Sequence, residues 1–227
     1  MAKSGNHIGE EKILYVEGPN DKWVTISLRQ QYQHKEDVNI IDLENCDRAL
    51  QALSMKASSP SDTKRIGLII DADTNITARY QSIIKELKST LGITITSAEL
   101  ANVNGFVRDI TNLAGDIVRI GIWIMPDNIN TGRLEDFLFS KIEETNGIFQ
   151  QVEPALSIIE HAAVADANIA DKLYRSIHRD KAKLHTFMAW NNPPDLSMGM
   201  AVRKGFFPVE SDTEKKFRTW IEKLFYS

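Results

Sequence analysis

Three short apolar segments constrain the fold of this chain more than any other feature of its sequence. They are too hydrophobic to lie outside a core, and they span residues 13–16, 66–70 and 117–125. Segments with apolar residues at helical spacing lie between them, as at Ile83, Ile84, Leu87 and Leu91. Strands that alternate with helices are typical of parallel βαβ units. The sequence therefore predicts an α/β fold, a Rossmann-like and mainly parallel sheet flanked by helices.

The rest of the chain divides into two parts. Residues 38–43 are predicted to form another strand and residues 93–96 an edge strand, whereas strand signals fade after about residue 132. Helical patterns then follow at 134–142, 149–163, 170–177, 181–190 and 214–225. We therefore expect an α/β core over 1–140 and a helical C-terminal extension over 141–227, packed on the core as one structural unit.

Composition narrows the class of protein. The 227 residues are 42% hydrophobic and 26% charged, which is ordinary for a globular protein with a substantial core. Cys46 is the only cysteine, so an internal disulfide and a cysteine-based zinc site are excluded, as suits a reducing compartment. No run of about 18 apolar residues exists, and the polar segment 1–11 lacks the apolar centre of a signal peptide. A cytoplasmic protein without a membrane span is expected.

The net charge of −4 bears on nucleic-acid binding. A protein that only binds nucleic acid is usually basic, which argues against that class here. A nuclease need not be basic, because the carboxylates that bind its metal make the site acidic. The net charge is therefore compatible with a catalytic protein.

Acidic residues follow each of the three apolar strands. Glu17 comes after the first, Asp71 and Asp73 after the second, and Asp127 after the third. The carboxyl ends of parallel strands meet at one edge of the sheet, and ligands bind there. Carboxylates gathered at one edge repel each other unless a cation lies between them, and their oxygens suit Mg²⁺ or Mn²⁺. The sequence predicts a metal site with one or two ions at this edge.

Two further acids have two interpretations each. Asp21 lies four residues after Glu17, where a helix would bring it back towards that residue, and Glu135 lies in the first turn of a later predicted helix. Each is a candidate metal ligand. Each can equally be an acid placed in a first turn by the helix dipole, and for Asp21 alone that is the simpler interpretation.

The order of these motifs resembles the Toprim domain of topoisomerases, bacterial primases, recombination proteins and OLD-family nucleases. Val16-Glu17-Gly18 matches the glutamate after its first strand, and Asp71-Ala72-Asp73 matches its Asp-X-Asp. The pair Glu17 and Asp21 is similar to the OLD-type arrangement. When the segments 125–136 and 180–183 are added to these motifs, the chain looks like a member of a small stand-alone Toprim-related family. The resemblance implies a Toprim fold and Mg²⁺ or Mn²⁺ binding.

A basic segment adds candidate phosphate-binding residues: Arg175, His178, Arg179, Lys181 and Lys183. Lys181, or else Lys183, can neutralise a scissile phosphate beside the metal, and OLD-type sites carry a late lysine that Lys181 resembles. The other cations can grip a nucleic-acid backbone. A charged helix face that is simply solvated is the competing interpretation.

Three functions follow from these residues. The first is a Mg²⁺-dependent nuclease acting on nucleic acid, DNA before RNA, with Glu17 as a metal ligand or general base. The second is a non-catalytic subunit, because the chain has no phosphate loop and an ATPase partner would be encoded separately; a homodimer is also open. The third and weakest is a phosphatase using Asp71.

Overall fold

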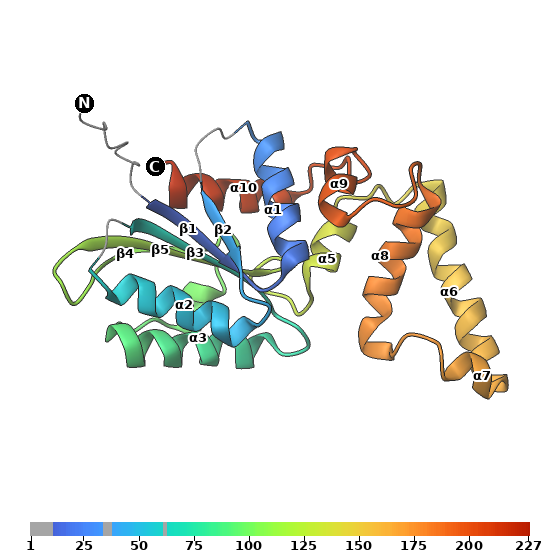
Figure 1. Cartoon of the computed structure of the whole chain (residues 1–227), viewed down its shortest axis with the longest axis horizontal. Helices are drawn as coiled ribbons and strands as arrows, with labels where there is room; N and C mark the ends of the chain where they lie inside the picture. The colour runs from blue at the N-terminus through green and yellow to red at the C-terminus, as the bar shows by residue number, and fades with distance from the viewer. Residues whose placement is uncertain (1–10, 34–37, 61–62) are drawn as a thin grey trace, which may run out of the picture.

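A five-stranded sheet forms the centre of the molecule (Figure 1). The structure is a computed structural model that describes residues 11–33, 38–60 and 63–227. The strands, in the spatial order β2-β1-β3-β5-β4, are β1 Glu11–Val16, β2 Asn39–Asp42, β3 Thr63–Asp71, β4 Phe106–Thr111 and β5 Ile117–Met125. Neighbouring strands are parallel except for β4, which is antiparallel to β5. The prediction of a mainly parallel α/β sheet with helices at the C-terminus is confirmed.

Helices cover both faces of this sheet. One face packs against α2 Cys46–Ser58, α3 Ile76–Leu91 and α4 Ser97–Leu100, and the other against α1 Pro19–Gln31 and α10 Asp212–Phe225. Side chains alternate between the two cores, so Ile13 and Tyr15 point to one while Leu14 and Val16 point to the other. Burial on both faces explains why the strands are apolar without interruption.

Two glycines let α10 lie close to the sheet. Gly67 and Gly121 are partners in the register of β3 and β5. A Cβ atom on Gly67 would come within 2.9 Å of Leu224, and one on Gly121 within 2.7 Å of the same side chain. Leu224 therefore fills the space that two absent side chains leave. Although α10 is the last helix in the sequence, it is part of the core of the sheet.

A helical arm stands apart from the sheet (Figure 1). We use this name for residues 147–190, which form α6 Gly147–Ala165, α7 Ala167–Ala170, the 3₁₀ turn η1 Ser176–His178 and α8 Arg179–Trp190. Phe187 of α8 contacts Phe149 of α6 edge-on within the arm, with ring centroids 5.5 Å apart. A tilted contact between Phe187 and Phe207, with centroids 6.0 Å apart, joins the arm to the core. Two short helices flank the arm, α5 Leu134–Phe139 and α9 Met198–Arg203.

Some predicted elements differ from the observed ones. Residues 93–96 are not a strand, because Thr96 caps α4 through a capping box with Glu99; the edge strand is β4 instead. The predicted helix at 170–177 is also wrong, because α7 ends at Ala170. None of the side chains of α7 is buried, so no packing stabilises a longer helix there. The polar segment 1–10 lies outside the described residues. No helix in the described part of the chain is long and apolar enough to cross a membrane.

Candidate functional site

A pocket of about 310 Å³ lies at the carboxyl edge of the sheet, and we call it the carboxylate pocket. Six charged residues, each in or just after a different element, line it. These residues are Glu17 after β1, Asp21 in α1, Glu44 after β2, Asp71 at the end of β3, Glu135 in α5 and Lys181 in α8. Four of the five acids are sequence-predicted site residues, which the fold brings together with the predicted lysine. Glu44 is an acid of this pocket that the sequence did not single out.

Backbone N–H groups hold three of the carboxylates in place. Strands β1 and β3 are adjacent, so Glu17 Oε2 can accept a hydrogen bond from Asp71 N at 3.3 Å. Asp71 Oδ1 accepts from Leu134 N at the start of α5, at 3.1 Å. Asp21 Oδ2 accepts from Gly18 N at 3.1 Å, so this acid also closes the first turn of α1. Both interpretations of Asp21 are therefore compatible with its position.

The carboxylates of this pocket are poorly compensated. Burial raises the pKa of Asp71, and the charges of Asp21, Glu17 and Glu135 raise it further. Burial likewise raises the pKa of Asp21, with Glu17 adding to it, and burial is the main cause that raises the pKa of Glu17. Asp21 Oδ1 is buried and accepts no hydrogen bond. The pocket thus disfavours the ionised form of its carboxylates, because they are buried and repel one another.

This pocket suits a hard cation by the chemistry of its donors. All of its acidic side chains offer oxygen, and the unsatisfied Oδ1 of Asp21 is a free acceptor inside it. Within the described residues, no group of three or more His, Cys, Asp or Glu side chains is arranged so that it could hold a metal ion. Mg²⁺ usually keeps several waters and takes only one or two carboxylates, so a three-residue cage is not required.

The other predicted metal ligands lie outside the pocket. Asp73 has a left-handed backbone (φ 54°) and forms ion pairs with Arg79 at 3.0 Å and Arg133 at 2.8 Å. Asp127 accepts hydrogen bonds from Ile129 N at 3.1 Å and from Asn130 N at 2.8 Å, which closes a turn. The expectation that Asp127 converges with Glu17 and Asp71 is not met, because Asp127 is not among the lining residues.

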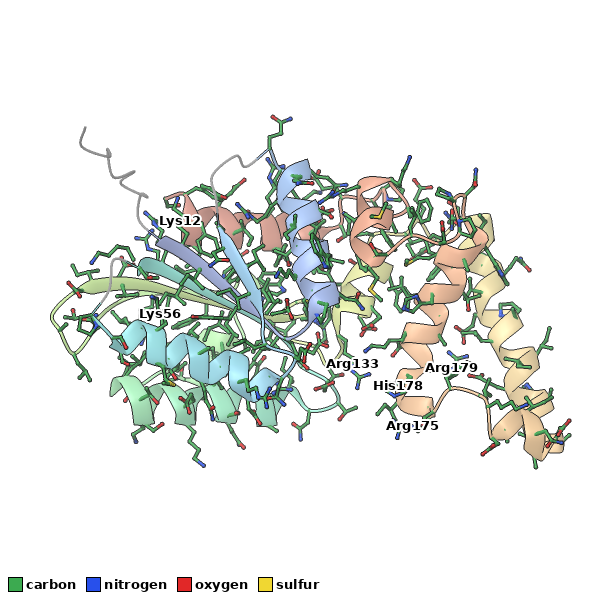
Figure 2. The ribbon with its side chains drawn as sticks, viewed as in Figure 1. Lys12, Lys56, Arg133, Arg175, His178 and Arg179 are labelled. Atoms are coloured by element: carbon green, nitrogen blue, oxygen red, sulfur yellow. The ribbon has the colours of Figure 1, made fainter. Side chains whose placement is uncertain are left out.

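Most of the predicted basic residues have partners within the arm. Arg179 pairs with Glu153 at 2.5 Å and Glu160 at 2.8 Å, and Lys183 pairs with Glu153 at 3.2 Å. Arg175 lies 3.3 Å from His178 Nε2 on the exposed 3₁₀ turn, and Figure 2 shows both near the start of α8. Lys181 is the only lysine or arginine among the described residues that line the carboxylate pocket, and it forms no ion pair with any of the described residues.

Arg133 is a site residue that the sequence analysis did not identify. Its Nε donates to Asp73, and its Nη1 donates to the carbonyl oxygen of Ile177 at 2.8 Å. It therefore connects the sheet edge to the start of α8, where Lys181 lies (Figure 2). Its position just before an acidic helix start was the available signal, but a side chain that reaches back to β3 cannot be read from spacing.

The electrostatics predict how stability changes with pH when no divalent cation is bound. Acids whose pKa is raised by folding hold protons that the unfolded chain releases near pH 4. Their stabilising contribution is complete below that pH and is lost as the pH rises through their raised pKa. We expect the melting temperature in EDTA to fall between pH 5.5 and 8, and Asp71→Asn to make that fall smaller.

Differential scanning fluorimetry of both proteins across this range checks the expectation. Asp109→Asn is the control, because Arg119 lowers the pKa of Asp109 and its titration lies below the range tested. If the melting temperature falls equally with pH in wild type and Asp71→Asn, the pKa of Asp71 is not raised by folding and the expectation is wrong.

Comparisons with known proteins add a family but no activity. A family model described as "Protein of unknown function (DUF3226)" matches residues 11–226. No curated protein and no solved structure matches the chain.

Proposed function

The chain belongs to the DUF3226 family, and from the carboxylate pocket we propose that it is a divalent-metal-dependent phosphodiesterase acting on nucleic acid. One observation carries this proposal. Glu17, Asp21 and Asp71 come from three different elements, and they line one pocket together with Lys181. A bound cation would stabilise buried carboxylates that repel each other. A lysine in the same pocket can bind the negative charge of a phosphate.

The resemblance to Toprim domains supports the same proposal. In that resemblance the glutamate and the Asp-X-Asp follow two strands of a parallel sheet. Here Glu17 follows β1 and Asp71 ends β3, and these strands are neighbours in the sheet. We extend the proposal to membership of the Toprim superfamily, close to the OLD-type nucleases.

Each residue of the pocket has a proposed role. Glu17 and Asp71 would hold Mg²⁺ or Mn²⁺, and Asp21 or Glu135 would bind waters of the ion. The bound cation would supply positive charge and an activated water to a phosphodiester. Lys181 lines the pocket from α8 and would bind a phosphate oxygen. Arg133 positions α8 through its hydrogen bond to Ile177.

The test is cleavage of plasmid, single-stranded DNA and RNA by the purified protein in Mg²⁺ or Mn²⁺. Asp71→Asn keeps the shape of the side chain but removes the charge, and we expect it to lower cleavage by about a hundredfold or more. Asp127→Asn is the matched control, because Asp127 follows a strand in the same way but lies outside the pocket. Cleavage that survives Asp71→Asn unchanged would refute the assignment.

Wild-type protein that cleaves none of these substrates would favour the second candidate, a non-catalytic subunit of a larger assembly. One observation supports that candidate. Ile158 and Val164 of α6 are 72% and 89% exposed on the arm, where a partner such as a separate ATPase or a second copy could cover them.

A further inference from the structure

A second pocket, of about 330 Å³, lies between α1 and α9, and we call it the tryptophan pocket. Helix α1 contributes Trp23 and Ser27, and the α9 segment contributes Ser197, Gly199, Met200 and Arg203. Trp23 and Met200 are each 51% exposed, although both are large apolar side chains. The pocket thus offers an aromatic face, a thioether and a guanidinium group to a ligand.

Close packing of the two helices forms this pocket before any ligand binds. A Cβ atom on Gly199 would come within 2.7 Å of the carbonyl oxygen of Trp23, so only glycine allows α9 to approach α1 here. Gln31 Nε2 donates to Val202 O at 2.9 Å, and Arg203 Nε donates to Ser27 Oγ at 3.2 Å. The walls are therefore held by the backbone and by hydrogen bonds between the helices.

The two pockets lie along the same helix. Asn20 lines the carboxylate pocket, and Trp23 lines the tryptophan pocket. Residues three apart on a helix are neighbours on its surface, with Cβ atoms about 5–6 Å apart. One ligand can therefore span both pockets along α1, with a phosphate in the first pocket and the group next to that phosphate in the second.

Resting on the proposed function, we propose that the tryptophan pocket binds an unpaired nucleobase next to the phosphate that is cleaved. A base has two flat faces that stack on an aromatic side chain, and arginine adds a cation–π contribution. Arg203 also adds positive charge beside a negatively charged strand. Because a base inside a duplex cannot reach such a pocket, the proposed substrate is single-stranded nucleic acid or a single-stranded end.

Binding is tested with a fluorescein-labelled 12-nucleotide oligothymidylate in Ca²⁺, measured by fluorescence anisotropy. We expect Trp23→Ala to weaken binding by about ten- to a hundredfold, and Trp23→Phe, which keeps an aromatic face, to restore most of the loss. Trp190→Ala is the matched control, because Trp190 is 46% exposed but lies at the end of α8. Melting temperatures confirm that each variant is folded.

A second measurement assigns the loss to a base. Oligothymidylates that each carry a single abasic position are scanned along the strand with wild type and with Trp23→Ala. One abasic position should weaken wild-type binding by the same factor as Trp23→Ala, and it should weaken the variant no further. Losses that simply add, or unchanged binding by Trp23→Ala, would overturn the inference.

The outcomes separate this inference from the proposed function. Oligonucleotide binding that depends on Trp23 without any cleavage would support the nucleobase pocket and refute the phosphodiesterase. Cleavage that depends on Asp71 but not on Trp23 would do the reverse. A shift of the oligomeric state by Trp23→Ala in light scattering, with oligonucleotide binding unchanged, would replace the base with a protein partner and overturn the inference.

Discussion

Replacing Lys181 with methionine is expected to lower the rate of nucleic-acid cleavage by about 10²–10³-fold without lowering stability. Lys181 forms no ion pair with the residues that the structure describes, and its side chain lines a pocket of acids. It therefore contributes little to folding, and a positive charge near a phosphate has its largest effect in the transition state. The measurement is kcat and KM together with the melting temperature.

Lys183→Met is the matched control on the same helix. Lys183 pairs with Glu153, and its ammonium group lies 5.1 Å from the ring centroids of both Phe139 and Phe149. Its loss should reduce stability and leave kcat within a few-fold of wild type. If Lys183→Met abolishes cleavage while Lys181→Met cleaves normally, the roles assigned to these two lysines are reversed.

The second large effect is expected at a buried ion pair in the core. Lys141 and Glu214 are 2% and 4% exposed and form an ion pair. Lys141 Nζ also donates to Val209 O at 3.1 Å, and Tyr32 Oη donates to Glu214 at 3.3 Å. Lys141→Ala leaves Glu214 without its cation in the core, so we expect unfolding free energy to fall by about 3–5 kcal/mol.

This loss corresponds to a melting temperature lower by roughly 6–20 °C, at about 2–4 °C per kcal/mol for a chain of this size. Urea unfolding measures the free energy directly. Lys215→Ala is the control, because Lys215 pairs with Asp212 at the surface and should change stability by less than about 1 kcal/mol. The double variant Lys141→Met with Glu214→Leu should regain much of the loss, and equal losses in single and double variants would contradict the explanation.

The sequence was sufficient to predict β1, β2, β3 and β5 and the centre of the carboxylate pocket, whereas β4 was not predicted and residues 93–96 were wrongly expected to be an edge strand. Unbroken apolar runs predict strands that are buried on both faces, and parallel strands place their following residues at one edge. Glu17 and Asp71 come together for that reason alone. Lys181 was predicted on the resemblance, since spacing cannot show which face of a late helix meets the sheet.

Residues beyond the strand ends could not be placed from the sequence. The rule that alternate residues share a face holds only within a strand, and Asp73 has already left it with a left-handed backbone. Asp127 closes a local turn, and Arg179 pairs with Glu153 and Glu160, which lie on another helix. Such local and long-range hydrogen bonds decide where a charged side chain points, and a one-dimensional pattern does not contain them.

The glycine pair under Leu224 has a consequence for how the protein is made. The strands that carry Gly67 and Gly121 leave the ribosome before α10 does, and this face of the sheet is not covered by Leu224 until that helix is made. A nascent chain that stops short of α10 therefore has every strand of the sheet but cannot close its second core. Completion of the sheet edge formed by β1 and β3 is thus tied to a helix that is translated after every strand of the sheet.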